Sequence, residues 1–299
     1  MHRPTEAANP QTSDLDLLPT GDILRRLLAE ERRVADALAA VLPELERAAD
    51  LLAAALHGGG SVHTFGAGSS GRLAALDAIE LGPTFGLPVG RYVAHCAGAE
   101  LGDGRAREAA EDDAAAGALA AAALTPRDVA LGVAASGSTP YVAGALGAAR
   151  IAGVSTILLS CSPHCPLGAA VDVHVAPDTG AEALAGSTRL KAGTATKIAL
   201  NALSTTAMIR IGRTYSNYMV WLDPANAKLQ SRAVQILAEV TSCRGDEAAA
   251  LLAAAGGELP TALVMALGGV DPLAARDALG RAQGSVRHAL SLLRAPGAP

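Results

Sequence analysis

Two serine-rich turns are the part of this sequence best suited to chemistry. Gly68-Ser69-Ser70-Gly71 and Ser136-Gly137-Ser138-Thr139 each follow an apolar run and precede a helical pattern. Backbone N–H groups, hydroxyls and a helix N-terminus together favour an anion such as phosphate. Either turn alone could be an ordinary helix cap, because Ser and Thr are common N-cap residues. Two such turns favour phosphate binding, and the candidate ligands are Ser69, Ser70, Ser136, Ser138 and Thr139.

Neither turn is typical of a nucleotide-binding loop. No Gly-Lys-Ser/Thr run follows either of them, as a P-loop would require. Gly66-Ala-Gly68-Ser-Ser-Gly71 matches the spacing of a dinucleotide-binding loop, but a single match of this kind is weak. The serines in this run favour a sugar phosphate over NAD.

Two carboxylates follow the first turn. Glu80 comes three residues after Asp77, so both belong to one face of the predicted helix, which Gly82-Pro83 is expected to end. A carboxylate beside a ligand turn could act as a general acid or base. The alternative for Glu80 is a solvated surface side chain.

An acidic cluster lies further along, on a helix predicted over residues 103–121. Its members are Glu108, Glu111, Asp112 and Asp113. Such a cluster is usually a solvated helix face, so spacing alone does not select one member as catalytic.

A long polar loop from Asp178 to Thr194 leads into another helical pattern. This pattern is typical of a third ligand loop. The alternative is a solvent loop followed by a capped helix start.

No metal site is expected. His63, His95 and His174 lie in or beside apolar runs and are interpreted as hydrogen-bonded core side chains. Cys161 and Cys165 lack the spacing and the second ligand pair of a zinc site. The cysteines are therefore expected to be reduced thiols.

Alternating strands and helices indicate the scaffold that positions these residues. The candidate strands are 61–65, 90–94, 128–134, 154–160 and 171–176. The candidate helices are 22–57 with a break or kink at Pro43, 70–80, 103–121, 139–152, 191–212 and 226–241. This alternation predicts an α/β fold with a parallel sheet covered on both faces. Ligands of such sheets bind at the carboxyl ends of the strands, where both serine turns fall.

Two domains are expected. Residues 1–242 would form the sheet domain with an N-terminal helical extension, preceded by an extended segment 1–18. Residues 243–299 would form a small three-helix domain, because Gly256-Gly257, Gly268-Gly269 and Gly284 interrupt its helical pattern.

Composition and charge restrict the class of protein. The formal charge is -5 and no basic block occurs, which argues against a nucleic-acid partner. No run of about 18 strongly apolar residues predicts a membrane span. The polar start lacks the plan of a secretory signal, so a cytoplasmic protein is expected.

Together these segments resemble the sugar isomerase (SIS) domain family and, within it, the N-acetylmuramic acid 6-phosphate etherases. The resemblance covers nearly the whole chain, including a small helical domain at its end. Its motifs, in order, are Thr5-Glu6-x-x-Asn9, Gly66 to Arg72, Asp77-Ala-x-Glu80, Pro83 to Gly86, Glu108-x-x-Glu111-Asp112, Ala134 to Tyr141, Glu182 to Lys197, Asn217-x-Met-Val220 and Asn226-x-Lys-Leu229-x-x-Arg232. Two departures stand out: the family usually has Asp where Trp221 stands, and Ser-Glu-Cys-Pro-Pro where this chain has Ile79-Glu80-Leu81-Gly82-Pro83.

The resemblance implies cleavage of the D-lactyl ether of N-acetylmuramic acid 6-phosphate, giving N-acetylglucosamine 6-phosphate and D-lactate. It implies that Glu80 protonates the ether oxygen and that Glu111 is the second catalytic carboxylate. In the polar loop, it implies that Glu182, Ser187 and Lys191 could close the pocket. No metal or redox cofactor is required, because two carboxylates in different environments suffice. A homodimer is also implied.

Two other functions stay open from the sequence. An aldose–ketose sugar-phosphate isomerase of the same fold would also need a base at C2 and an anchored phosphate, and release of D-lactate would distinguish the etherase from it. A non-catalytic sugar-phosphate sensor, like the glucokinase regulatory protein, would be stabilised by its ligand without turnover.

Overall fold

The computed structural model describes residues 4–99, 108–224 and 226–294. The chain forms two compact units, which are described separately below. The first unit contains Met1–Ala78 and Gly90–Ser204, and the second contains Ile79–Val89 and Thr205–Pro299. The expected division after residue 242 therefore does not coincide with the division into compact units.

A five-stranded parallel sheet forms the centre of the first unit, as the sequence predicts. Its strands are β1 (Val62–Gly66), β2 (Tyr92–Cys96), β3 (Val129–Val133), β4 (Ser155–Leu159) and β5 (Val173–Val175), in the order β2-β1-β3-β4-β5. Every residue of β3 is buried. This burial on both faces explains why β3 is a continuous run of small and apolar residues.

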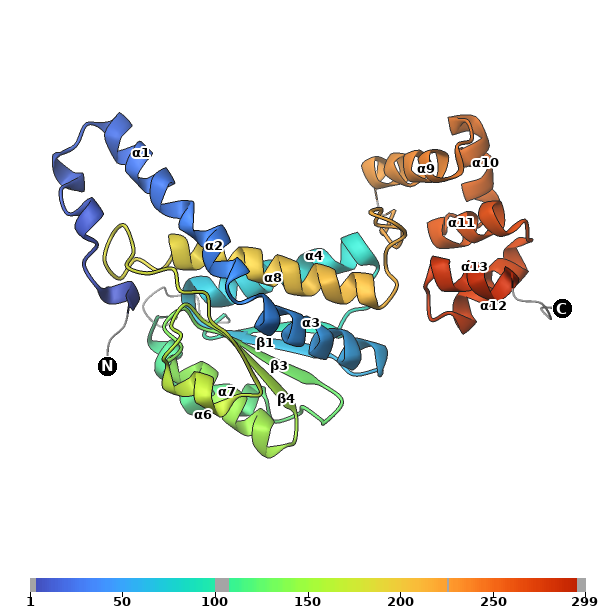
Figure 1. Cartoon of the computed structure of the whole chain (residues 1–299). Helices are drawn as coiled ribbons and strands as arrows, with labels where there is room; N and C mark the ends of the chain where they lie inside the picture. Colours follow the sequence, from blue (N-terminus) through green and yellow to red (C-terminus); the bar gives the residue numbers. More distant parts are fainter. Residues whose placement is uncertain (1–3, 100–107, 225, 295–299) are drawn as a thin grey trace. The chain divides into compact units, whose positions relative to one another are not determined.

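Helices cover both faces of this sheet (Figure 1). α6 (Ala114–Ala120) and α7 (Pro140–Ile151) lie on one face, and α3 (Leu42–His57), α4 (Gly68–Phe85) and α8 (Lys191–Arg210) lie on the other. α6 and α7 pack closely because both have glycine at the contact. A Cβ on Gly117 would lie 1.9 Å from the carbonyl oxygen of Tyr141, and one on Gly144 would lie 1.9 Å from that of Ala114.

The N-terminal region differs from the prediction in two ways. Within the described part of residues 1–18 the chain forms three 3₁₀ helices, Pro4–Glu6, Pro10–Thr12 and Leu15–Leu17, in place of an extended segment. The helix predicted over 22–57 is divided into α1 (Thr20–Glu31), α2 (Arg33–Ala39) and α3. The predicted break at Pro43 is confirmed, because this proline stands at the second position of α3, where its missing N–H costs no hydrogen bond.

Two other helix predictions need correction. α4 runs through Gly82-Pro83 and ends at Phe85, where Gly86 has a left-handed φ of 59° and donates its N–H to the carbonyl of Gly82 at 2.8 Å. The helix predicted over 103–121 lies partly outside the described residues. In its described part, a 3₁₀ helix (Ala110–Asp112) precedes α6, whose N-terminus the Asp113 side chain caps through the N–H of Ala116.

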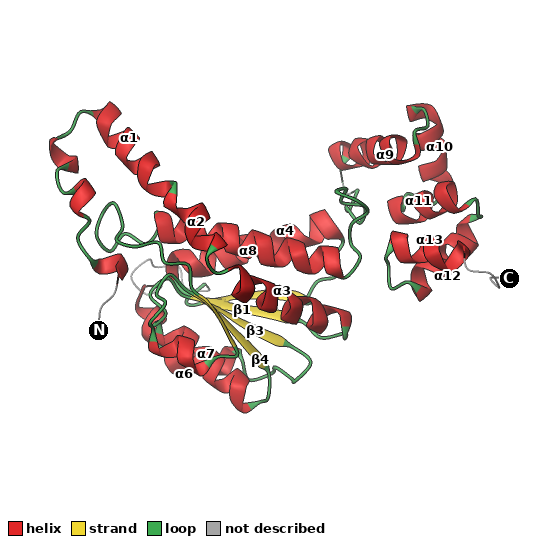
Figure 2. Cartoon of the chain, viewed as in Figure 1, coloured by secondary structure: helices red, strands yellow, loops and turns green. Residues whose placement is uncertain are grey.

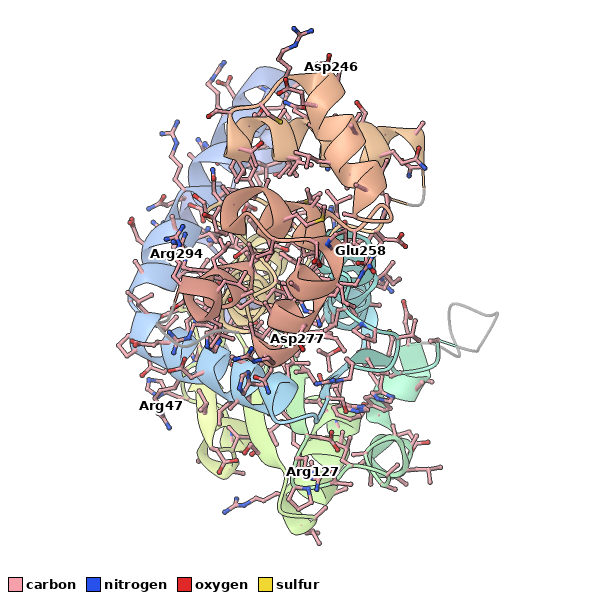
Figure 3. The ribbon with its side chains drawn as sticks, turned by 90° about the vertical axis from the view of Figure 1, so that its right-hand side faces the viewer. Arg47, Arg127, Asp246, Glu258, Asp277 and Arg294 are labelled. Carbon is pink, nitrogen blue, oxygen red and sulfur yellow. The ribbon has the colours of Figure 1, made fainter. Side chains whose placement is uncertain are left out.

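The second unit contains a group of helices (Figure 2): α9 (Ala227–Thr241), α10 (Gly245–Ala254), α11 (Leu259–Gly268), α12 (Pro272–Arg281) and α13 (Val286–Arg294). The described part of 243–299 thus holds four helices, and the prediction of three is wrong. Leu237, Leu263, Val264 and Val286 are fully buried in its core. Charged side chains, among them Asp246, Glu258, Asp277 and Arg294, lie on its surface (Figure 3).

No single helix among the described residues is long and apolar enough to cross a membrane. The pair α10 and α11 passes the same test of length and composition together, but the two are bent by 108°.

Candidate functional site

The two serine-rich turns lie side by side at the carboxyl edge of the sheet. The first is the opening turn of α4, one residue after β1, and the second joins β3 to α7. β1 and β3 are paired neighbours in the sheet, and adjacent strands are about 4.8 Å apart. All five candidate ligands, namely Ser69, Ser70, Ser136, Ser138 and Thr139, are half-buried in these turns.

Glycine is required in both turns by close approach of other atoms. A Cβ on Gly71 would lie 2.5 Å from Sγ of Cys96, and one on Gly137 would lie 2.3 Å from Sγ of Cys165. Gly137 also has a left-handed φ of 63°. In the second turn the Ser136 hydroxyl accepts hydrogen bonds from the N–H and the hydroxyl of Ser138, at 3.3 and 3.1 Å. Sequence and packing thus give two tight turns with clustered hydroxyls.

A groove between α4 and the start of α8 opens beside the first turn. Its volume is about 540 Å³, and its walls combine cationic and apolar side chains with two hydroxyls. The cations are Arg72, Arg189 and Lys197. Arg72 donates a hydrogen bond to the Ser69 hydroxyl at 3.2 Å. These three cations were not among the candidate ligands from the sequence, although each lies within one of the motif runs.

Glu182 and Lys191, two of the candidates in the third loop, are buried. The Glu182 carboxylate accepts the backbone N–H groups of Lys191 and Ala192 at 3.0 and 2.9 Å, and so caps α8. Burial raises the pKa of Glu182, although these two N–H donors and the Lys191 charge oppose the rise. The Lys191 ammonium pairs with Glu30 and donates to the carbonyl of Ala181. Both side chains therefore fix the loop, while Ser187 lies half-buried within it.

The N-terminal segment holds the same loop, which the sequence reasoning missed. Asn9 donates to the Glu30 carboxylate at 2.8 Å and to the carbonyl of Ala181 at 3.4 Å. The Thr12 hydroxyl donates to the carbonyl of Ala183 at 2.9 Å, and the carbonyl of Thr5 accepts the N–H of Gly186 at 2.9 Å. The motif Thr5-Glu6-x-x-Asn9 was the available signal, but nothing local in it indicates a partner so distant in sequence.

The two candidate catalytic carboxylates are both exposed. Glu80 lies on α4 within the second unit, and Glu111 lies in the 3₁₀ helix Ala110–Asp112 of the first unit. Asp77 differs from Glu80, because it is buried and accepts a hydrogen bond from the Ser204 hydroxyl at 3.1 Å. Asp77 and Glu80 both lie on α4, three residues apart, but only Glu80 is open to solvent.

The histidines are hydrogen-bonded, as predicted. Nδ1 of His63 lies 2.9 Å from Nε2 of His95, and Nε2 of His63 lies 2.9 Å from the Ser61 hydroxyl. His174 is 2.9 Å from the Ser160 hydroxyl through Nε2. Within the described ranges, no group of three or more His, Cys, Asp or Glu side chains is arranged to hold a metal ion.

Trp221, one of the two departures from the family pattern, packs within the second unit. Its indole N–H donates to the carbonyl of Gly284 at 2.9 Å, and the Arg213 guanidinium lies 4.6 Å from its ring centre. The tryptophan thus has a packing role in that unit. In the other departure, Leu81 is buried and Ile79 is 71% exposed.

Comparison with known proteins gives a consistent result. Residues 44–150 match the family model of the glucokinase regulatory protein N-terminal SIS domain. An N-acetylmuramic acid 6-phosphate etherase of Thermobifida fusca is 53% identical over 255 residues, which are 85% of this chain and 84% of the relative. Proteins with the same name from Salmonella choleraesuis and Mesorhizobium japonicum are 46% and 44% identical, and each match covers 96% of this chain. These two matches cover 97% of the Salmonella protein and 94% of the Mesorhizobium protein.

Solved structures agree on the fold. A phosphoheptose isomerase from Francisella tularensis superposes with a TM-score of 0.50 at 19% identity, covering 64% of this chain and 98% of that chain. A Bacteroides fragilis protein gives a TM-score of 0.50 at 22% identity, covering 69% of this chain and 98% of that chain. At these identities the likeness concerns the fold alone.

Proposed function

This chain belongs to the N-acetylmuramic acid 6-phosphate etherase family, and we propose that Glu80 and Glu111 are the two carboxylates that carry its reaction. The protein is a carbon–oxygen lyase that cleaves the D-lactyl ether of N-acetylmuramic acid 6-phosphate, a step in amino sugar recycling. The observation that carries this function is the 44–53% identity to etherases over most of the chain. The paired serine turns on a SIS-type sheet are consistent with it.

The proposed reaction is an elimination followed by addition of water. In the open-chain aldehyde the carbonyl acidifies the proton at C2, which a base removes. The C2–H electrons form a double bond to C3, and the C3–O bond breaks with its electron pair going to the ether oxygen. That oxygen takes a proton and leaves as D-lactate. Water then adds at C3, C2 regains a proton, and N-acetylglucosamine 6-phosphate results.

The two glutamates supply the proton transfers of this scheme. Glu80 gives its proton to the ether oxygen, so it must be protonated when substrate binds. Glu111 takes the C2 proton or activates the incoming water, so it must be ionised. Both side chains are exposed in the structure, so both are open to a bound sugar.

The phosphate of the substrate would lie at the serine turns. The hydroxyls of Ser69, Ser70, Ser136, Ser138 and Thr139 and the N-terminus of α7 offer donors there. Glu182 and Lys191 would close the pocket indirectly, because they fix the loop that carries Ser187. The two serine turns and the loop that carries Ser187 are distant in sequence, and in this arrangement all three would serve one ligand.

A homodimer is the proposed assembly, and α1 supports it. This helix buries only Glu30 and extends from the rest of its unit (Figure 1). Leu24 and Leu28, one turn apart on α1, are 54% and 66% exposed, and Leu17 just before the helix is 79% exposed. An unpartnered apolar stripe of this kind is suited to the same stripe on a second copy. Leu24→Glu/Leu28→Glu should give a monomer in analytical ultracentrifugation.

We place this protein in the cytoplasm, where its phosphorylated substrate would be found.

The decisive experiment is a D-lactate assay on the purified protein with N-acetylmuramic acid 6-phosphate. One D-lactate per substrate, absent from the Glu80→Gln/Glu111→Gln variant, is expected. Formation of an isomeric sugar phosphate without lactate would support an isomerase instead. Thermal stabilisation by the sugar phosphate without turnover would support a sensor.

A further inference from the structure

The groove between α4 and α8 has three cationic side chains in its walls. Arg72, Arg189 and Lys197 line it, and no carboxylate is among the described residues of its walls. Arg72 and Arg189 are exposed, so their charges reach an incoming ligand. Like charges gathered in a concave surface attract an anion more strongly than isolated surface cations do. The groove is therefore suited to an anionic group.

The backbone adds to this preference. Ser69 is the second residue of α4, and Gly193 is the third residue of α8. Both residues line the groove, so the N-terminal ends of two long helices border it. The Glu182 carboxylate already accepts the first two N–H groups of α8. The N-terminus of α4 is therefore the end whose helix dipole favours negative charge in the groove. Charge and backbone thus point to the same class of ligand.

The remaining walls of the groove are apolar. This lining decides whether the groove suits the phosphate or the lactyl carboxylate of the substrate. Leu73 and Leu76 of α4 and Ile198 of α8 lie beside the cations. The substrate carries a phosphate and a lactyl group, which combines a carboxylate with a methyl group. A phosphate has no apolar part to place against leucine and isoleucine. Guanidinium groups bind a carboxylate through two parallel hydrogen bonds. The mixed lining therefore matches the lactyl group better than the phosphate.

We propose that the groove holding Arg72, Arg189 and Lys197 binds the D-lactyl carboxylate, while the adjacent serine turns bind the phosphate. This inference rests on the proposed function and deepens it, since it assigns a separate subsite to each anion of the substrate. It also gives a physical basis for specificity. A sugar phosphate without the lactyl group would leave the cationic groove unfilled.

The test compares the substrate with its lactyl methyl ester, which keeps the ether and the methyl group but lacks the negative charge. Wild-type protein should favour the acid by about tenfold or more in kcat/KM, as expected for a charged hydrogen bond. Arg189→Gln and Arg72→Gln, on separate segments, should each reduce this preference. Arg189→Lys keeps the charge and should restore part of it. Thermal melting establishes that each variant is folded.

The two products separate the subsites in a second measurement. N-acetylglucosamine 6-phosphate carries only the phosphate, and D-lactate carries only the carboxylate. Arg189→Gln should weaken inhibition by D-lactate and leave inhibition by N-acetylglucosamine 6-phosphate unchanged. An unchanged preference for the acid over the ester in both glutamine variants would overturn the proposal. Selective loss of inhibition by the sugar phosphate would also overturn it, because the groove would then hold the phosphate. Absence of D-lactate release by the wild type would instead refute the proposed function.

Discussion

Lys191 and Glu30, which are 161 residues apart in sequence, form an ion pair whose side chains are only 1% and 6% exposed. Asn9 and the carbonyl of Ala181 complete the hydrogen bonding around it. Burial alone would raise the pKa of Glu30, but the hydrogen bond and charge of Lys191, with help from Asn9, lower it. The carboxylate is thus held ionised, and the pair joins the N-terminal helices to the start of α8.

Breaking this pair should be costly. Lys191→Met leaves the Glu30 carboxylate buried without its cation and should lower the free energy of unfolding by about 3–5 kcal/mol. Adding Glu30→Gln removes the stranded charge and should recover part of the loss. Urea unfolding measures both. Arg25→Met is the matched control, because its pair with Asp22 is exposed and should contribute less than about 1 kcal/mol. Equal losses for Lys191→Met and Arg25→Met would contradict the account.

The His63–His95 contact should make stability depend on pH. Asp128, whose pKa is held at about 2 by hydrogen bonds that outweigh its burial, can only accept. The Ser61 hydroxyl donates to it at 2.7 Å, so Ser61 accepts from Nε2–H of His63. Nδ1 of His63 is then bare and accepts from Nε2–H of His95. A proton on this Nδ1 would set two N–H groups against each other.

Burial lowers the pKa of both histidines in the folded protein. The charge of His63 lowers the pKa of His95 further, while the Asp128 charge opposes the fall at His63. Above the ordinary pKa of 6.5 the histidine is neutral in both the folded and the unfolded protein, so the lowered pKa does not change stability. Below that pH the unfolded protein binds protons more readily than the folded one, and stability falls. We expect a lower urea midpoint at pH 5.5 than at pH 7.5, and a smaller difference in His63→Leu/His95→Leu. His57→Gln, at the exposed end of α3, is the control. An identical pH dependence in the double variant would refute the histidine origin.

Close packing of α6 against α7 gives a third prediction. Gly144→Ala places a Cβ 1.9 Å from the backbone oxygen of Ala114, so the helices must separate. The expected loss of stability is about 1–3 kcal/mol. Gly147→Ala on the same helix meets nothing within 4 Å and should stabilise by about 0.5–1 kcal/mol. Thermal melting of the two variants should therefore shift in opposite directions, and a loss for both would show that helix packing is not the cause.

What the sequence could reveal depends on how local the signal is. The strands and serine turns were predictable because apolar runs and Gly/Ser turns act over a few residues. The end of α4 was not predictable in this way, because the helix tolerates Pro83 in its interior and ends only before Gly86. In the tail, the three glycine sites do separate helices, but three separators divide a segment into four.

Long-range partners were beyond a sequence reading. Lys191 and Glu182 have the residue types of ligands, and only the fold shows that one pairs with Glu30 and the other caps α8. Arg72, Arg189 and Lys197 stand in different segments, and only the packing of α4 against the start of α8 brings them to one groove. Whether Glu80 and Glu111 are catalytic stays a prediction from family resemblance.

Glu80→Gln tests the division of roles between the two carboxylates. If Glu80 protonates the leaving ether oxygen, the amide variant cannot supply that proton, but Glu111 can still remove the proton at C2. In deuterium oxide the recovered substrate should therefore gain deuterium at C2, while D-lactate release falls by about 100-fold or more. Glu111→Gln should lose both exchange and lactate. Asp112→Asn, next to Glu111 and equally exposed, is the matched control and should keep both. Loss of both C2 exchange and lactate release in Glu80→Gln, with C2 exchange kept in Glu111→Gln, would reverse the assignment, because Glu80 would then be the base.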